Sequence, residues 1–302
     1  MAGSFRSVVL RGQSFAKYAY LRRFEPTRFR ASVRTYPSSV NEEYIKDQHK
    51  NEEYEEDGSN RQPGYDDLYP GHIPTTPFQR ALLAVGSAAM CLYNPARDDM
   101  ICALGESTGY YSLKAAHKKM LSDPTGRQIL EEQPLLNTDT VDIEYLGTLP
   151  EGTFGKEYWK FLNKHGFSPD ARLPVHFIDD PELVYVMLRY RQVHDLMHTL
   201  LGMPPNMLGE VAVKWVEAIQ TGLPMCVLAA LFGPLRLGPK HRQKYLDTYL
   251  MWAIRCGTNA KFLLNVYFEK QWEKNLDDLR RELNVEPAPV PLIRTGKKQA
   301  VA

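Results

Sequence analysis

The sequence has 302 residues, of which 43% are hydrophobic, and it carries 37 Lys and Arg against 36 Asp and Glu, a formal net charge of +1. This composition excludes a wholly disordered or collagen-like chain, and the length is sufficient to bury a substantial core. The small total charge hides two segments of opposite sign, because residues 1–41 carry seven arginines and one lysine against a single glutamate, which leaves the remainder acidic.

The first 40 residues have the composition of a targeting segment. They are rich in arginine and serine and almost free of acidic residues. A mitochondrial transit peptide has this composition, whereas a secretory signal would need a continuous apolar core. A basic nucleic-acid-binding arm is the alternative, but the arginines alternate with hydroxyl and aromatic residues rather than cluster. We therefore expect a transit peptide over 1–40, cleaved near residues 34–36, and no nucleic-acid partner.

A second segment of different character follows over residues 41–67. It is acidic and contains few large aliphatic side chains, so it cannot bury much apolar surface. We expect a solvated acidic linker here, a folded domain over 68–283 and a flexible tail over 284–302.

The first helix of the folded part is expected over 77–93. Its uninterrupted apolar stretch is about 13 residues long, shorter than the roughly 20 that a membrane span needs, so we expect a core helix. The glycine-containing sequence at 104–109 lacks the Gly-Lys-Ser/Thr of a phosphate-binding loop and predicts a tight turn. Shorter helices follow over 111–123, 124–133 and 153–166.

The next helix has strong boundary signals. Asp180 can cap its amino end, Pro181 suits the first helical position and Gly202 suits the exit. Further helical segments are expected over 204–222, 224–235, 239–257 and 258–283. We find no run with the alternating pattern of a strand. The sequence therefore predicts an all-α fold, a single compact helical domain.

The four cysteines are Cys91, Cys102, Cys226 and Cys256. They form no Cys-x-x-Cys pair and lie in apolar surroundings, which excludes a structural zinc ribbon. We expect reduced, buried thiols.

Residues 191–210, RQVHDLMHTLLGMPPNMLGE, contain the candidate site. On one helix, His194 and His198 lie about 40° apart around the axis and Asp195 about 60° further round, so the three side chains can converge. The short proline-rich turn favours an antiparallel partner helix, which returns Glu210 to the level of the histidines. The sequence predicts a metal site on a helical hairpin.

Two imidazoles and two carboxylates suit zinc or another divalent first-row metal such as Fe²⁺. Asp195 could instead orient a histidine without touching the metal, and Glu217 could support the site or form only a surface ion pair. A buried polar cluster that joins two helices without metal is a further alternative. The pattern differs from the HExxH of zinc peptidases, and the remaining histidines do not complete the set of an HD-type phosphohydrolase.

Two stretches together carry a family resemblance. The first is residues 68–109. The second is a His-Asp-x-x-His pattern, followed after eleven residues by Glu210. The chain resembles the coenzyme Q biosynthesis protein 4 family of mitochondria over about residues 66–283. The resemblance implies that His194, Asp195, His198 and Glu210 are the metal ligands and catalytic residues, with zinc as the metal usually assigned.

The resemblance also implies an activity in ubiquinone biosynthesis. This is a carbon–carbon lyase that removes the C1 carboxyl of a 4-hydroxy-3-methoxy-5-polyprenylbenzoate, by simple decarboxylation or by oxidative replacement. The polyprenyl tail requires an apolar groove, for which the helices over 77–93 and 224–235 are candidates.

The implied setting is a peripheral position on the matrix side of the mitochondrial inner membrane, in a multi-enzyme ubiquinone-synthesis complex that the protein would organise. The expected partners are the other enzymes of that complex, the polyprenylated substrate, the membrane surface and a second copy of the chain. A non-catalytic lipid-binding scaffold with a structural metal is the alternative function, and a nucleotide phosphohydrolase is a third.

Overall fold

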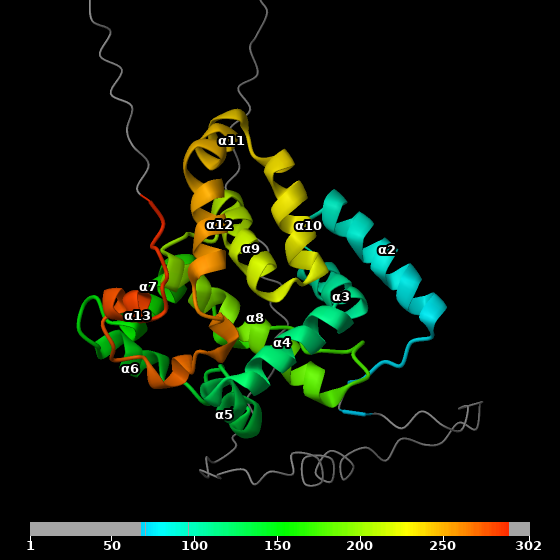
Figure 1. The fold of residues 1–302 in the computed structure, drawn as a ribbon, viewed down its shortest axis with the longest axis horizontal. Coiled ribbons are helices and arrows are strands. Elements are labelled where there is room, and N and C mark those ends of the chain that lie inside the picture. Colours follow the sequence, from blue (N-terminus) through cyan, green and yellow to red (C-terminus); the bar gives the residue numbers. More distant parts are fainter. Residues whose placement is uncertain (1–67, 70, 96, 290–302) are drawn as a thin grey trace, which may run out of the picture. The chain divides into compact units, whose positions relative to one another are not determined.

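The computed structural model describes residues 68–69, 71–95 and 97–289, and these form an all-α fold (Figure 1). The described residues contain no β-strand, and an isolated bridge joins Thr153 to Asn275. The all-α prediction is confirmed. The predicted transit peptide, the acidic linker and the end of the predicted tail, 290–302, lie outside the described residues.

Helices follow one another along the domain with short connections. They are α2 (Pro77–Tyr93), α3 (Asp98–Thr108), α4 (Tyr110–Ser122), α5 (Pro124–Glu132), α6 (Ile143–Thr148), α7 (Phe154–His165), α8 (Pro181–Leu201), α9 (Met207–Thr221), α10 (Pro224–Phe232), α11 (Pro239–Lys244), α12 (Leu250–Asn259) and α13 (Leu276–Glu282). Shorter helical turns lie between several of them: η1 (Pro169–Ala171), η2 (Gly233–Arg236), η3 (Tyr245–Tyr249), η4 (Leu263–Asn265) and η5 (Phe268–Lys270).

Helix α8 lies in the core and has the boundaries that the sequence predicts. The Asp180 side chain accepts a hydrogen bond from the Glu182 amide, and Pro181 is the first helical residue. Gly202 ends the helix at φ 71°, a left-handed conformation that glycine adopts without steric cost. Sixteen of the 21 residues of α8 are buried, so other elements enclose it on nearly every side.

Charged side chains on α8 are matched by partners from distant segments. Arg189 pairs with Glu269, Arg191 with Glu106, and Asp195 with Arg172. A buried charge without a partner is strongly destabilising. These pairs therefore allow a partly polar helix to occupy the core.

A tight turn between α8 and α9 reverses the chain. Asn206 caps α9 by accepting a hydrogen bond from the Gly209 amide over 3.0 Å, and the Glu210 amide donates to the Asn206 carbonyl over 2.7 Å. A Cβ atom on Gly209 would lie 1.8 Å from the Pro204 carbonyl oxygen, so the turn has no room for a side chain there. Glu210 consequently lies in the first turn of α9.

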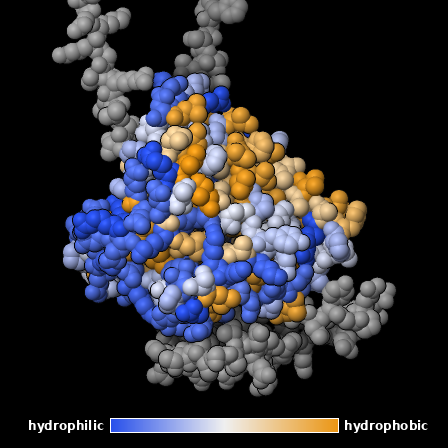
Figure 2. Space-filling model, viewed as in Figure 1, coloured by the Kyte–Doolittle hydropathy of each residue, from blue (hydrophilic) through white to orange (hydrophobic). Residues whose placement is uncertain are grey.

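Helix α2 is not the core helix that its composition predicts. Only Ser87 of its 17 residues is buried. One side of α2 packs on α3, while the other exposes large apolar side chains (Figure 2). The prediction was wrong because apolar residues occur on both sides of this helix. Composition alone does not show that other helices cover only one of the two sides.

The tight turn predicted over 104–109 is also wrong, because the chain is helical as far as Thr108. Gly105 lies inside α3, where a Cβ atom would approach the Met225 sulfur to 2.4 Å. This glycine therefore permits close packing of α3 against α10.

The helix predicted over 258–283 forms only in its last part. Residues 260–275 consist of short turns and irregular chain, and a regular helix begins at Leu276. The described chain then continues past 283. Val285 is buried, the Glu286 carbonyl accepts a hydrogen bond from Trp252 over 2.9 Å, and the Ala288 amide donates to the Leu201 carbonyl over 2.8 Å.

The cysteines are free thiols, as predicted. Cys226 and Cys256 are buried, whereas Cys91 and Cys102 are half-buried, so the expected burial holds for two of the four.

Candidate metal centre

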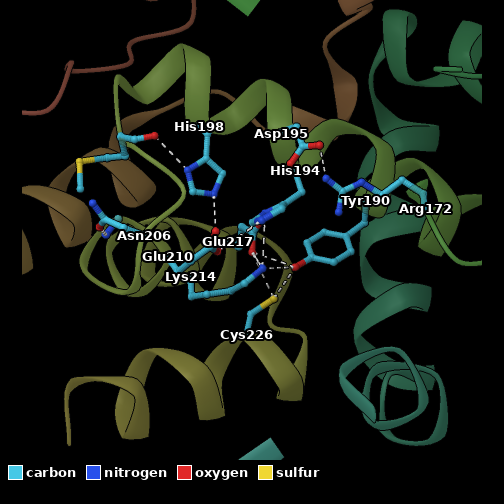
Figure 3. Close-up of polar contacts among 12 residues, drawn as sticks. Arg172, Tyr190, His194, Asp195, His198, Asn206, Glu210, Lys214, Glu217 and Cys226 are labelled. Carbon is cyan, nitrogen blue, oxygen red and sulfur yellow. Dashed lines mark hydrogen bonds and ion pairs between the residues drawn. The ribbon is translucent and has the colours of Figure 1, made fainter. Parts of the chain in front are cut away.

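Three side chains of the α8–α9 hairpin converge on one point (Figure 3). The Nε2 atoms of His194 and His198 lie 3.5 and 3.2 Å from the two carboxylate oxygens of Glu210. The imidazole centroids are 4.8 Å apart, and the rings stand nearly perpendicular at 87°. The return of Glu210 to the level of the histidine pair is confirmed.

His198 directs its Nε2 atom at this point because its other nitrogen is already bonded. Nδ1 lies 3.0 Å from the Met203 carbonyl oxygen, which can only accept, so Nδ1 carries a hydrogen. Nε2 is buried and makes no hydrogen bond, although a Glu210 oxygen is 3.2 Å away. A buried nitrogen that faces a carboxylate without a hydrogen bond suits a shared cation.

His194 is held in the same way by a carboxylate. Its Nδ1 donates to Glu217 Oε1 over 2.6 Å, which leaves Nε2 toward Glu210. Metal-binding histidines commonly donate their second nitrogen to a carboxylate or a backbone carbonyl, which fixes the tautomer and the ring orientation. Both histidines of the hairpin have this arrangement.

The spacing fits a tetrahedral divalent cation. Ligand atoms about 2.0–2.1 Å from a tetrahedral metal stand roughly 3.3 Å from one another. The two separations between imidazole nitrogen and Glu210 oxygen, 3.2 and 3.5 Å, lie on either side of that value. Three protein ligands are typical of zinc sites that keep a fourth position for water or substrate, whereas structural sites use four.

Asp195, the fourth predicted ligand, lies outside this group of three. Its carboxylate is ion-paired with Arg172, and Figure 3 shows the two side chains facing each other. Asp195 projects about 100° further round the helix than His194. Sequence spacing therefore predicted that Asp195 could lie near the site. It could not predict that Arg172, from another segment, pairs with Asp195.

Behind His194 lies a buried network of ionisable groups. The Glu217 carboxylate accepts hydrogen bonds from Lys214 Nζ over 2.7 Å and from the Tyr190 hydroxyl over 2.8 Å, in addition to that from His194. The Cys226 thiol lies 3.6 Å from the same carboxylate. The sequence left two roles open for Glu217, support of the site or a surface ion pair. These contacts fit support of the site.

Charge pairing outweighs burial in this network. Burial would raise the pKa of Glu217, but the Lys214 and His194 cations hold it far below its ordinary value. Burial would likewise raise the pKa of Glu210, and the two histidines hold it well below its ordinary value. Burial and Lys214 lower the pKa of His194, yet Glu217 and Glu210 raise it to about 9. Without metal, His194 is therefore protonated at neutral pH.

Asp98, the first residue of α3, interacts electrostatically with residues of the same site. Although the side chain of Asp98 is exposed, neighbouring protein atoms partly desolvate it and raise its pKa; the Arg172 guanidinium opposes that rise, and the Glu210 carboxylate adds to it. Asp98 therefore interacts electrostatically both with Glu210 and with Arg172, the partner of Asp195.

Some of these residues could have been found from sequence. Lys214 lies three positions before Glu217 and Tyr190 lies four before His194, so helical spacing connects them to the site. Asp98 and Arg172 come from other segments, and no local pattern connects them to residues 191–210.

Comparisons with known proteins find relatives that match the domain. The family profile described as coenzyme Q (ubiquinone) biosynthesis protein Coq4 matches residues 69–289. The chain is 55% identical over 222 residues to the ubiquinone biosynthesis protein COQ4 homolog, mitochondrial, of Rattus norvegicus, which covers 74% of this chain and 84% of that protein. It is 52% identical over 230 residues to the Homo sapiens protein of the same description, covering 76% and 87%.

A solved structure shares the fold. It is the crystal structure of a protein from Nostoc punctiforme, named as a candidate ubiquinone biosynthesis protein, with a TM-score of 0.55. The match covers 66% of this chain and 95% of that chain at 19% identity. At this identity the likeness concerns the fold alone.

Proposed function

The chain belongs to the Coq4 family of coenzyme Q (ubiquinone) biosynthesis proteins, and from this membership we propose that it is a metal-dependent carbon–carbon lyase of ubiquinone biosynthesis. The proposed reaction removes the C1 carboxyl of a 4-hydroxy-3-methoxy-5-polyprenylbenzoate. The observation that carries the proposal is the convergence of His194, His198 and Glu210, which could supply three ligands to a metal and would leave room for substrate as a fourth.

We propose that these three residues hold the metal. The donor set of two imidazoles and one carboxylate matches zinc, with Fe²⁺ as the alternative. A divalent metal bound there supplies a Lewis acid for the substrate carboxylate or phenolate. Asp195, which the family resemblance implies as a ligand, is proposed to act by holding Arg172 beside the site.

The protein's own groups have separate tasks in this proposal. Glu217 and the Met203 carbonyl keep hydrogens on the Nδ1 atoms, so that both Nε2 atoms stay directed at the site. When the bond from C1 to the carboxyl breaks, CO₂ leaves and the ring carbon takes up a proton. Asp98 is the acid beside the site, and its raised pKa suits it to hold that proton.

An oxidative course would replace the carboxyl with a hydroxyl instead, releasing CO₂, with dioxygen as the oxidant and a two-electron reductant from solution that converts its second oxygen atom to water. Zinc has no redox chemistry. This course therefore needs either a redox-active metal or direct reaction of dioxygen with the electron-rich ring.

The proposed location is the matrix side of the mitochondrial inner membrane, reached by means of the leader over 1–40. The relatives are named as mitochondrial proteins, which supports the compartment. No helix among the described residues has both the length and the hydropathy of a membrane span. The proposed partners are the other enzymes of the ubiquinone-synthesis complex, which the chain would help to organise, and a second copy of itself.

The reaction can be tested directly. The full chain, loaded with zinc or with Fe²⁺, would be incubated with the prenylated benzoate under air and under nitrogen, and the products identified by mass spectrometry. A product that lacks the carboxyl under both gases supports simple decarboxylation. A product with a hydroxyl in its place, formed only in air, supports oxidative replacement. Absence of both products with either metal contradicts a lyase.

The scaffold alternative is separated by His194→Ala and Glu210→Ala variants in cells. A lyase predicts that the complex stays assembled while the carboxylated intermediate accumulates. Dissociation of the complex in these variants would favour a scaffold with a structural metal.

A further inference from the structure

One side of helix α2 is a continuous apolar stripe in contact with solvent. Phe78, Leu82, Val85 and Leu92 are 72%, 57%, 71% and 59% exposed. At about 100° per residue these side chains fall within an arc of about 80°. The buried Ser87 lies on the opposite side of the helix, which packs on α3. A helix that is apolar on both sides is normally covered on both.

A second stripe follows from α10 into η2. It consists of Leu228, Leu231, Phe232 and Leu235, which are 36%, 53%, 45% and 69% exposed and have the spacing of one helix face. Both helices pack on α3, and Arg236 donates a hydrogen bond to the Tyr93 carbonyl at the end of α2 over 3.2 Å. Figure 2 shows apolar residues gathered over α10 and α2, and we call the two stripes together the apolar face.

The segment that contains the second stripe and α11 carries charge of a single sign. Residues 218–246 contain four Lys and Arg and no Asp or Glu. Three of these cations, Lys240, Arg242 and Lys244, lie on α11, directly after the second stripe. None of the three is ion-paired with a carboxylate in the part of the chain that the structure describes.

We propose that the apolar face and α11 dock together on a bilayer surface that carries anionic lipid headgroups. A protein at such a surface buries apolar side chains at the boundary between headgroups and acyl chains and directs cations at the phosphates. Protein–protein interfaces usually contain hydrogen bonds among their apolar contacts. The side chains of the two stripes have no hydrogen-bonding group, which favours a bilayer over a protein partner. The proposal deepens the proposed membrane location and does not depend on the lyase reaction.

The segment that carries the second stripe also packs on α9, the helix that contains Glu210. Gly233 of η2 packs so closely on Val211 that a Cβ atom would lie 2.6 Å from Val211 Cγ2, and Val211 directly follows Glu210. Helix α2, which carries the other stripe, ends at Tyr93, five residues before Asp98. Docking on this face would bring the three metal-binding side chains close to the bilayer surface, where a substrate with a long apolar tail would be dissolved.

Vesicle binding of the full chain tests the proposal. The two probes are vesicles of phosphatidylcholine alone and of phosphatidylcholine mixed with cardiolipin, and bound protein is measured by co-sedimentation. One variant combines Leu82→Ser with Leu231→Ser. A second combines Lys240→Gln, Arg242→Gln and Lys244→Gln. The leader is present in every protein, so its own attraction to anionic lipid is common to all of them.

Matched controls come from a different helix. Leu121→Ser alters a side chain of α4 that is 47% exposed, and Lys114→Gln with Lys118→Gln removes exposed charge from the same helix. All substitutions are at exposed positions except that of Lys244, which is half-buried, and circular dichroism would check that each variant is folded.

The apolar variant should bind both vesicle types at least about tenfold more weakly, because it lacks two leucines that the bilayer would bury. The basic variant should lose roughly 100-fold on the anionic vesicles only, at about 1 kcal/mol for each charge, and this loss should shrink in high salt. Binding equal to the controls in both variants would overturn the proposal. It would also be overturned if the apolar variant bound vesicles normally but lost self-association or binding to a pathway enzyme.

Discussion

His194 and Glu217 are joined inside the α8–α9 hairpin by a hydrogen bond of 2.6 Å from Nδ1 to Oε1. The carboxylate is completely buried, and Lys214 balances its charge from 2.7 Å away. The bond determines which nitrogen of His194 faces the proposed metal centre. A residue that hydrogen-bonds a metal-binding histidine does not touch the metal, but its substitution usually lowers metal affinity.

The variant Glu217→Gln should therefore bind metal about 10- to 100-fold more weakly. Competition with a chromophoric chelator would measure this. Glu106→Gln is the control, because it removes another buried carboxylate that is ion-paired, with Arg191. It should lower thermal stability and leave the metal affinity of the folded protein unchanged. Equal losses of affinity in both variants would contradict a specific role of Glu217.

The variant Asp195→Asn should retain one metal per chain, because Asp195 lies outside the group of three proposed ligands. It should be less stable by roughly 1–3 kcal/mol, since Arg172 loses its partner but is partly exposed to water. Chemical denaturation and elemental analysis would measure the two effects. His198→Ala should lose the metal. If Asp195→Asn also loses it, Asp195 is a ligand as the family resemblance implies.

The variant Gly209→Ala should weaken both folding and metal binding. The added carbon would lie 1.8 Å from the Pro204 carbonyl oxygen, so the turn must move and displace Glu210. We expect a loss of about 1–3 kcal/mol in the free energy of unfolding. Gly86→Ala in α2 is the control, because no atom lies within 4 Å of its added carbon, and it should stabilise slightly.

Metal binding should release a proton and become stronger as the pH rises. Because the pKa of metal-free His194 is about 9, a proton occupies the imidazole at neutral pH and competes with the metal. Affinity should fall about tenfold for each pH unit below that value. Calorimetry in buffers of different ionisation enthalpy would count the released protons, and a count of zero at neutral pH would contradict the raised pKa.

The same pKa has a consequence for the metal-free protein. A pKa raised by folding stabilises the folded state fully below the unfolded value of about 6.5, and that contribution is lost as the pH rises through about 9. Metal-free protein should therefore lose stability over this interval. His194→Gln should remove this part of the pH dependence, which denaturation at several pH values would show.

The variant Asp98→Asn should lower turnover of the prenylated benzoate by about 100-fold or more, while metal binding is retained. The reason is that the proposed proton donor is lost while the three ligands remain. Asp99→Asn is the matched control, because Asp99 is the next residue and pairs instead with Arg97 over 2.6 Å. Equal rates for the two variants would remove Asp98 from the mechanism.

The hairpin could be predicted because its signals are local. A capping aspartate, an initial proline and a terminal glycine mark α8, and they act within a few residues of themselves. The spacing of His194 and His198 and the short turn before Glu210 then determine the convergence of the three side chains. Each of these steps uses only helix geometry.

The features that the sequence could not show depend on distant segments. Arg172 binds Asp195 from an irregular connection, and Asp98 reaches the site from α3. The exposure of one side of α2 depends on which helices pack around it. The irregular chain over 260–275 contains residues that suit a helix, but tertiary packing determined the outcome there.

The ion pairs of α8 also determine how far this helix can move. Arg189, Arg191 and Asp195, together with His194, are each joined to a separate segment, through Glu269, Glu106, Arg172 and Glu217. Sliding or rotating α8 by even one residue would break these links together, so the helix has a single register in the fold. The two imidazoles are thus in position before any cation arrives, and ion binding need not supply the free energy to order them.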